Sequence, residues 1–594
     1  MTESTKTRFL IICVACSVVA TVIILQMIRI PNTASAARIL ADSENYQGEY
    51  HLIYPDRGRI YDSRGNLLAG NETAYEVGLD LKAYRQPETI ASIVSSILGL
   101  DYSSVLRYAQ MTPEEANRSY IPLDNFVDRD KIEQLEVINE DYKNRKTKGN
   151  EIAPSLSGLV WSPHSHRSYP EGELASNILG FYSYLDRTGG IGYFGVEEAY
   201  DSQLSGTPRE VFYVYDPQRL STVEEVPPGV SLVLTIDREI QAMTEQILDE
   251  AIEWSGSEGG TILVYNPEDG GIIAMATTPR LDPSRYWEYS ELFPNPKPYN
   301  SAISKTYEPG SVFKVLTMAA ALDSGTVDPE STFNDIGHFY IGGATIYNWD
   351  RGAWGTVDMT ECLQYSLNTC MTWLATEMGP DTFYSYLKAF GLDRKTGIDM
   401  GGESTWPLKI PGDNQWYEVD LATNSFGQGI SLTPIQMAMS IGALANDGRM
   451  MAPHVVKAMI INGQQYEVDP VVVGTPITAD TAVTITEMLH TSLEDEASVA
   501  LIEGYSVAGK TGTGEIATEV GYSAAGTNAS FVGWGPVEDP KFLVYVWLEK
   551  PTISQWGSET AAPTFSKLVS KLVILMDIPP DSVRLSGNWQ TMGE

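Results

Sequence analysis

The sequence predicts an α+β protein of two or more domains behind one N-terminal transmembrane helix. Three observations lead to this prediction. The chain has 594 residues, which is too long for a single hydrophobic core. Residues 9–28 form an apolar stretch of twenty residues that contains no charge. Beyond residue 230, apolar strand-like runs and longer helical segments follow one another, as in a sheet with segregated helices.

The stretch Phe9–Ile28 is long enough to cross a membrane, since twenty helical residues span about 30 Å. Lys6 and Arg8 precede it, so the positive-inside rule leaves residues 1–8 in the cytoplasm and the rest of the chain outside. The rival interpretation is a cleaved signal peptide, because Ala34–Ala36 resembles a cleavage site. The apolar run exceeds the usual signal length and ends well before that site, which favours a retained anchor.

Charge and composition exclude several classes of protein. The formal net charge of −37 repels phosphate backbones, so we expect no nucleic-acid partner. Four cysteines are too few for a disulfide scaffold. The six histidines form no metal-ligand pattern, and His164 and His166 lie in a Ser- and Pro-containing stretch that predicts a solvated loop. We therefore expect neither a metal nor a cofactor.

A Pro- and Gly-containing segment at residues 221–230 predicts a linker and the best domain boundary. We place one domain at residues 29–225 and a second at residues 226–594. In the second domain, the pattern predicts a helix over residues 238–254. Two apolar runs around a turn at Glu268–Gly271 then predict a β-hairpin.

The first candidate for chemistry is Ser311 with Lys314, in the segment YEPGSVFK. Pro and Gly predict a turn, followed by a buried helix over residues 311–322. The two side chains are one helical turn apart and share a face. Serine is a weak nucleophile until a neighbour takes its proton, and a lysine kept from water can do so. A chance match is the alternative, because S-x-x-K fixes only two positions.

Two further motifs follow. Ser366 and Asn368 form S-x-N, in which a hydroxyl can relay a proton and an amide can hold a peptide group. Lys-Thr-Gly occurs at Lys395–Gly397, in a loop, and again in Lys510–Thr513, after a strand-like run. A strand that lines a cleft suits binding better, since Gly512 lets a substrate backbone approach. We therefore interpret the later copy as functional and the earlier one as structural.

In this order the three motifs match the serine-lysine set of β-lactamases and penicillin-binding proteins. The chain as a whole resembles a class B, monofunctional penicillin-binding protein. The segment Arg57–Ala69 is similar to the family's opening R-G-x-I-x-D-x-x-G-x-x-L-A pattern. Further similar stretches are Arg167–Pro170, Gly195–Glu197, Thr433–Gln436, Asn528–Gly533 and Ala561–Pro563.

The resemblance implies a fold and an activity. We expect a penicillin-binding-protein/β-lactamase-like transpeptidase domain, an antiparallel sheet covered by helices, over residues 226–594. It would stand on an elongated, mixed, non-catalytic pedestal at residues 29–225. The activity would be a peptidoglycan D,D-transpeptidase outside the cytoplasm that cross-links stem peptides and is acylated by β-lactams. We recognise no glycosyltransferase domain, so the resemblance implies a SEDS-type glycosyltransferase as partner.

The resemblance also implies a role for each motif residue. Ser311 would attack the carbonyl of a D-alanyl-D-alanine end, with Lys314 as general base. Ser366 would pass a proton to the leaving D-alanine. The substrate amide and terminal carboxylate would be held by Asn368, Lys510, Thr511 and Thr513, with Gly512 between them.

Cys362 and Cys370 flank the S-x-N motif. On one continuous helix, eight residues would place them about 12 Å apart, too far for a disulfide. In the family this motif lies at a turn between helices, which would permit a bridge. Both possibilities stay open at this point.

Three other functions remain compatible with parts of the pattern. A β-lactamase or β-lactam sensor shares the motifs but would not need the long pedestal. A D,D-carboxypeptidase would pass the acyl group to water, and the motifs alone do not exclude it. A scaffold with a vestigial site would not need the complete set of motif residues.

Overall fold

The computed structural model describes residues 3–29, 33, 35–36, 48–145, 153–184, 189–214, 226–496, 498–518 and 521–586. They fall into two compact units, Met1–Pro55 with Gly206–Pro228, and Asp56–Ser205 with Gly229–Glu594. Ala34 of the possible cleavage site and residues 221–225 of the expected linker lie outside the described residues.

The first unit contains the apolar helix. Helix α1 spans Glu3–Arg29 and includes the predicted stretch 9–28, so this helix is confirmed. Its segment Leu10–Arg29 has a mean hydropathy of 2.7 and none of it is buried, so it is long and apolar enough to cross a membrane. In the same unit, β1 (Gly48–Ile53) pairs in antiparallel fashion with β8 (Arg209–Val214).

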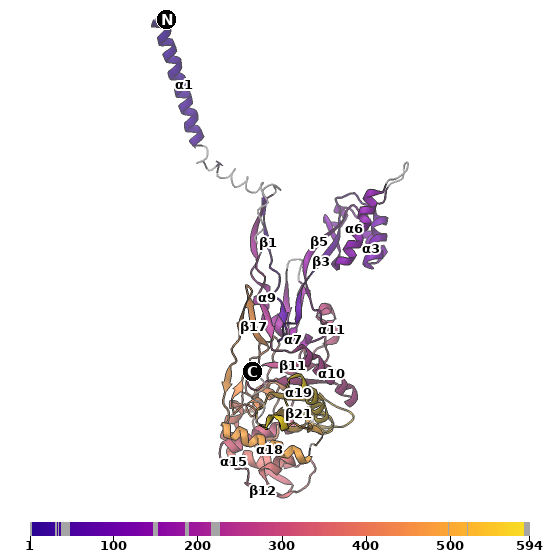
Figure 1. Cartoon of the computed structure of the whole chain (residues 1–594), viewed down its shortest axis with the longest axis vertical. Coiled ribbons are helices and arrows are strands. Elements are labelled where there is room, and N and C mark those ends of the chain that lie inside the picture. Colours follow the sequence, from indigo (N-terminus) through magenta and orange to yellow (C-terminus); the bar gives the residue numbers. More distant parts are fainter. Residues whose placement is uncertain are drawn as a thin grey trace. The chain divides into compact units, whose positions relative to one another are not determined.

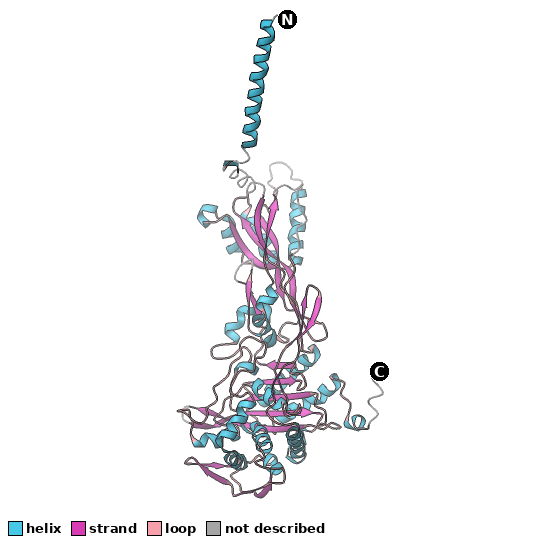
Figure 2. Cartoon of the chain, turned by 90° about the vertical axis from the view of Figure 1, so that its left-hand side faces the viewer, coloured by secondary structure: helices cyan, strands magenta, loops and turns pink. Residues whose placement is uncertain are grey.

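The second unit is built around a five-stranded antiparallel sheet, and Figure 2 shows its strands among helices. Its strands, in spatial order, are β11 (Ile272–Thr277), β10 (Gly259–Tyr265), β22 (Phe542–Glu549), β21 (Gly521–Gly535) and β20 (Ala508–Thr518). β10 and β11 form the predicted hairpin. β20, which carries the later Lys-Thr-Gly, lies at the edge of the sheet.

Helices cover both faces of this sheet. One core contains α10 and α19, and the other contains α13 and α17, with bounds Arg238–Ser255, Ala561–Leu575, Lys314–Asp323 and Pro434–Gly442. Side chains alternate along a strand, so Val544 and Val546 of β22 join the first core and Tyr545 and Trp547 the second. A strand that is buried on both faces has a continuous apolar sequence, and β22 has such a sequence. The predicted α+β class is confirmed.

A second sheet joins the two sequence regions within this unit. Its order is β18-β17-β9-β2-β3-β4, with β5 also paired to β3. The strands span Gln464–Glu467, Val456–Ile461, Ser231–Leu234, Ile60–Tyr61, Leu67–Asp80, Tyr120–Val127 and Leu159–Ser168. β2 and β9 pair in parallel, with Ile60 opposite Leu232. In Figure 1, β3 and β5 lead to the helices α3 (Pro87–Leu98) and α6 (Arg129–Asn144).

The predicted loop around His164 and His166 is wrong. Both residues lie on β5, opposite Ala74 and Glu72 of β3. The Ser and Pro content does not exclude a strand here, because within the part of the chain that the structure describes β5 pairs with β3 alone, and a strand paired on one side tolerates Pro163.

A smaller group of elements surrounds the S-x-N segment. β12 pairs with β15 and β13 with β14, each pair antiparallel. These strands span Thr332–Asp335, Gly355–Asp358, His338–Ile341 and Ala344–Tyr347. The helices α14, α15, α16 and α18 span Met359–Gln364, Asn368–Ala389, Glu418–Ser425 and Ala479–Glu496.

A buried ion cluster holds the N-terminal part of the second unit together. Glu197, which is fully buried, accepts hydrogen bonds from Nε of Arg57 at 2.7 Å and from Nε of Arg167 at 2.8 Å. The hydroxyl of Tyr169 donates to the same carboxylate at 3.1 Å. Burial by itself would raise the pKa of Glu197, but the two guanidinium groups more than offset it and lower the pKa. The ionised cluster therefore ties together segments more than 100 residues apart in the chain.

We expect Glu197→Gln to lower the stability of the second unit by roughly 3–5 kcal/mol, because it leaves two buried guanidinium groups without their anion. The measurement is thermal unfolding of the full-length protein in detergent. The control is Glu198→Gln, which alters an exposed carboxylate next in the chain.

The difference in stability between wild type and Glu197→Gln should also depend on pH. Since the pKa of Glu197 is lowered on folding, its contribution is present above the unfolded-state pKa and is lost as the pH falls through the folded value. The difference between wild type and Glu197→Gln should therefore shrink in acid. A difference that grows toward low pH would contradict this assignment.

Candidate active site

Ser311 and Lys314 lie where the buried helix begins. A 3-10 turn, Gly310–Phe313, carries Ser311 and leads directly into α13. The predicted helix over residues 311–322 is thus confirmed, with a tighter first turn. The Lys314 side chain is fully buried, and its Nζ donates hydrogen bonds to the carbonyl oxygen of Ser366 at 2.6 Å and to Oγ of Ser366 at 3.1 Å. The first and second motifs are therefore in direct contact.

Ser366 occupies a tight turn between α14 and α15. Its φ of 55° lies in the left-handed region, which costs a non-glycine residue roughly 1–2 kcal/mol. The turn is closed by hydrogen bonds from the backbone N–H of Ser366 to the Leu363 carbonyl and from that of Leu367 to the Cys362 carbonyl. The Leu367 side chain is buried in the core. This packing holds Ser366 in its strained conformation and turns its polar atoms toward Lys314.

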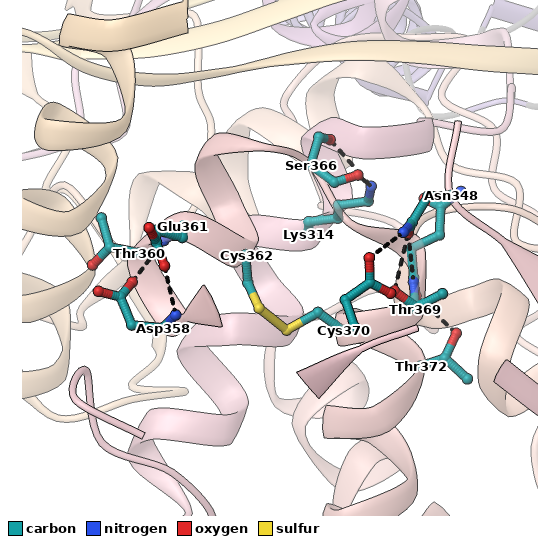
Figure 3. Close-up of a disulfide and its surroundings, with 12 residues drawn as sticks. Lys314, Asn348, Asp358, Thr360, Glu361, Cys362, Ser366, Thr369, Cys370 and Thr372 are labelled. Carbon is teal, nitrogen blue, oxygen red and sulfur yellow. Dashed lines mark hydrogen bonds between the residues drawn. A yellow bond between two sulfur atoms is a disulfide. The ribbon is translucent and has the colours of Figure 1, made fainter. Parts of the chain in front are cut away.

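Cys362 and Cys370 form a disulfide across this turn (Figure 3). Their Cα atoms are 6.1 Å apart, because the chain reverses between the two helices instead of continuing as one. Of the two possibilities that the sequence left open, the bridged one is therefore the one present. It fixes the ends of the segment that carries Ser366 and Asn368.

A buried polar network, which the sequence did not reveal, holds the start of α15. Oδ1 of Asp335 accepts from the hydroxyl of Thr369 at 2.8 Å, and Oδ2 accepts from Nδ2 of Asn348 at 2.8 Å and from the backbone N–H of Trp354 at 2.9 Å. Asn348 also accepts from Thr369. No spacing signal identifies these residues, since they come from separate strands and loops. Together they fix α15 next to the Ser366 turn, as Figure 3 shows for Asn348 and Thr369.

β20 lies directly against the turn that carries Ser311. A Cβ atom at Gly512 would come within 2.8 Å of Val312 Cγ1, and one at Gly310 within 2.5 Å of the Thr513 carbonyl oxygen. Gly310 has a φ of +61° as well, so a side chain there would be both crowded and strained. Glycine at these positions lets the edge strand pack against the backbone around Ser311. The third motif therefore lies beside the first.

The remaining motif side chains have local partners. Nζ of Lys510, a buried residue, lies 3.4 Å from Oγ1 of Thr511. Oγ1 of Thr513 accepts from the backbone N–H of Gly557 at 3.2 Å. Nδ2 of Asn368 donates to the Tyr347 carbonyl oxygen at 3.1 Å. The three motifs thus come together, because Lys314 of α13 contacts Ser366 in the turn before α15 and β20 packs against the turn that carries Ser311.

Two tryptophans connect the opposite sides of this site. Nε1 of Trp349 donates to the carbonyl of Tyr365, next to Ser366, at 3.1 Å. Trp556 precedes Gly557, which binds Thr513 on the β20 side. The two indole rings meet edge to face, with centroids 5.6 Å apart. Sequence reasoning missed this pair, whose only signal is the presence of Trp residues in turn-rich segments.

The earlier Lys-Thr-Gly copy serves its own loop. The backbone N–H and the hydroxyl of Thr396 both donate to Glu403, at 2.6 and 2.7 Å. Within the described residues, no group of three or more His, Cys, Asp or Glu side chains is placed to hold a metal ion.

Two family models match the chain. The penicillin binding protein transpeptidase domain matches residues 260–570, and the penicillin-binding protein dimerisation domain matches residues 52–230. Stage V sporulation protein D of Bacillus subtilis is 30% identical over 552 residues, which cover 90% of this chain and 81% of that protein. Peptidoglycan D,D-transpeptidase FtsI of Escherichia coli is 28% identical over 442 residues, 72% of this chain and 70% of that protein.

Solved structures share the fold. Penicillin binding protein 2X from Streptococcus thermophilus superposes with a TM-score of 0.72 at 23% identity, covering 91% of this chain and 82% of that one. Penicillin binding protein 3 from Mycobacterium tuberculosis, solved in complex with aztreonam, gives 0.66 at 23% identity, covering 89% and 98%. These two similarities bear on the fold alone, and they confirm the predicted transpeptidase fold.

The polar network predicts a local effect. Thr369→Val removes a hydroxyl donor from the buried carboxylate of Asp335, so the segment 363–370 should open more easily, by about tenfold in the hydrogen-exchange rate of its amides. The measurement is hydrogen–deuterium exchange with mass spectrometry on the full-length protein.

The matched control is Thr372→Val on the same helix. Its hydroxyl donates within α15, to the Asn368 carbonyl at 2.9 Å, and its loss should change little. Equal exchange in the two variants would show that the Asp335 network does not hold the turn.

Proposed function

This chain belongs to the class B penicillin-binding proteins, and we propose that it is a peptidoglycan D,D-transpeptidase that works through an acyl-enzyme on Ser311. The observation that carries the proposal is the buried amine of Lys314, one helical turn from Ser311 and in contact with the hydroxyl of Ser366. The names of its relatives, which include a peptidoglycan D,D-transpeptidase and a penicillin-binding protein, support the proposal.

In the proposed acylation, Oγ of Ser311 attacks the carbonyl carbon of the penultimate D-alanine of a donor stem. An ester bond forms, the bond to the terminal D-alanine breaks, and the proton of Ser311 passes to a neutral Lys314 amine. Its contact with Ser366 offers a route by which a proton reaches the leaving amine. An amine of a second stem then attacks the ester, which forms the cross-link and frees Ser311.

The proposed donor path follows β20. An edge strand can pair with an extended peptide. The terminal carboxylate would be bound by Lys510, Thr511 and Thr513, and the carbonyl oxygen by the backbone N–H groups of Ser311 and Thr513. The carbonyl oxygen of the Asn368 amide would accept an N–H group from the donor. The packing of Gly512 against Val312 supports this path, because it places β20 next to Ser311.

We further propose that α1 is retained as an anchor and that the catalytic part lies outside the cytoplasm. Two observations support this location. The charged residues Lys6 and Arg8 precede the apolar segment, and the Cys362–Cys370 bridge is of a kind that persists in oxidising compartments. The family resemblance supports a SEDS-type glycosyltransferase as the partner that supplies the glycan strands.

We expect fluorescent penicillin to label the full-length protein stably and to leave Ser311→Ala unlabelled, because only the serine ester retains the drug. The matched control is Ser404→Ala, an exposed serine, which should be labelled like wild type. The measurement is in-gel fluorescence over time. Labelling of Ser311→Ala would show that Ser311 is not the nucleophile. Rapid loss of label from wild type would indicate a β-lactamase.

A second measurement separates cross-linking from hydrolysis. We expect a stem-peptide donor with an added acceptor amine to yield more aminolysis product as the acceptor concentration rises, at the expense of hydrolysis, because both compete for one acyl-enzyme. Mass spectrometry measures the two products. A product ratio that ignores the acceptor would make the chain a D,D-carboxypeptidase.

A further inference from the structure

The contact between Trp349 and Trp556 has no role in the acylation proposed above. Trp349 lies in the loop after β14 and Trp556 in the loop after β22. Trp349 is 53% exposed and Trp556 is half-buried, and the two rings meet edge to face with centroids 5.6 Å apart. An edge-to-face contact between aromatic rings is favourable but weak. Such a contact can hold two loops together and still open.

Trp349 belongs to the side of the cleft that carries the second motif. Its Nε1 donates a hydrogen bond of 3.1 Å to the carbonyl oxygen of Tyr365, the residue before Ser366. Two residues before Trp349, the carbonyl oxygen of Tyr347 accepts a hydrogen bond of 3.1 Å from Nδ2 of Asn368. The position of the Trp349 ring is therefore fixed relative to the turn that carries Ser366.

Trp556 belongs to the opposite side, which is formed by β20. The backbone N–H of the next residue, Gly557, donates to Oγ1 of Thr513 at 3.2 Å. A Cβ atom at Gly557 would lie 2.2 Å from the carbonyl oxygen of Gly512, so the loop lies directly against the third motif. The carbonyl oxygen of Trp556 also accepts from the hydroxyl of Thr560 at 2.9 Å. These contacts fix Trp556 relative to β20.

The contact between the two rings crosses the outer side of the cleft. Ser311 lies between the two sides described above. Lys314 contacts Ser366 on one of them, and Val312 packs against β20 on the other. On its inner side Ser311 leads into the buried helix α13, so water reaches the half-buried Ser311 from the outer side. Because Trp349 is itself exposed, the ring contact lies on that outer side.

An acyl-enzyme on Ser311 has two possible fates. In cross-linking, the amine nitrogen bonds to the acyl carbon, the ester bond to Oγ breaks, and a proton of the amine returns to Oγ. In hydrolysis, a water oxygen bonds to the acyl carbon, the same ester bond breaks, a carboxylic acid is released, and a proton of water returns to Oγ. Lys314 can serve as the base for either nucleophile. The choice between them therefore depends on which nucleophile reaches the ester.

We propose that Trp349 and Trp556 form a cover over this ester that slows its hydrolysis and so reserves it for an amine acceptor. Nε1 of Trp349 is engaged by the Tyr365 carbonyl, so the rest of this ring offers water no hydrogen-bond partner. Exclusion of water from a closed site protects a reactive intermediate from hydrolysis. The inference rests on the proposed function, for which it names two residues that determine the choice of acceptor.

The first test measures the lifetime of the ester. The full-length protein in detergent is acylated with fluorescent penicillin, free drug is destroyed by an added β-lactamase, and loss of label is followed by in-gel fluorescence. We expect Trp349→Ala and Trp556→Ala to lose label about fivefold faster than wild type, which is the scale of one aromatic contact. Trp349→Phe and Trp556→Phe keep a ring in place and should stay close to wild type.

A double variant tests whether the two rings act as one cover. If they do, Trp349→Ala combined with Trp556→Ala should lose label no faster than either single variant, because the first substitution already opens the cover. Two independent effects would multiply instead, to about 25-fold. A product that is multiplied in this way overturns the assignment of a shared cover.

The second test measures the choice of acceptor. With a D-alanyl thioester donor and an added acceptor amine, we expect the Ala variants to shift the ratio of hydrolysis to aminolysis upward by about the same fivefold. The rate constant of acylation by benzylpenicillin should not fall, because the cover does not activate Ser311. Loss of acylation in the Ala variants would show that the two rings maintain the site rather than cover it, and would overturn the inference.

The matched control is Trp287→Ala, which removes an exposed Trp of the 3-10 segment Pro283–Glu288 and should release label like wild type. Equal label lifetimes in wild type and in both cover variants overturn the inference. If wild type is acylated while all variants release label equally, the proposed function stands and the cover assignment fails. If wild type is not acylated at all, the proposed function itself fails.

Discussion

The arrangement of the site depends on one buried amine. An ammonium or amine group taken out of water needs oxygen partners, and Lys314 obtains two from a single residue, the carbonyl and the hydroxyl of Ser366. Both can face Lys314 only because Ser366 adopts a left-handed conformation. The disulfide between Cys362 and Cys370 and the packing of Leu367 hold that conformation. The strained conformation of Ser366 thus explains why the disulfide, the packing of Leu367 and the hydrogen bonds of Lys314 all act on one turn between two helices.

The sequence was sufficient where the signal is local or repeats with a regular period. The apolar length of α1, the hairpin β10–β11 and the helix after Ser311 follow from such patterns, and all three are present. The order of three short motifs, together with the segments around them, identified the transpeptidase fold. These patterns reflect local backbone preferences and the burial of apolar side chains. Few other structures of the chain would satisfy both.

The features that the sequence did not reveal are contacts between distant segments. The carboxylate of Asp335 accepts a hydrogen bond from the hydroxyl of Thr369, and the ring of Trp349 packs against that of Trp556, on the other side of the site. For neither pair does the spacing of the two residues in the sequence predict the contact. The disulfide stayed open for a related reason, because eight residues permit a bridge across a turn and forbid it along a helix. The composition of β5 predicts a loop, because it carries no sign of β3, the strand with which β5 pairs among the described residues.

The shared sheet sets a limit on how the chain can be divided. β2 comes from the segment before the predicted linker and β9 from the segment after it, yet their backbones pair with each other. Separating the two segments would remove a paired neighbour from β2 and from β9 and leave backbone N–H and C=O groups unpaired on both strands. Bare strand edges recruit other chains, so either fragment made alone would be prone to aggregate. The two regions recognised by separate family models therefore share one sheet, and truncation at their junction would leave a strand of that sheet unpaired in each fragment.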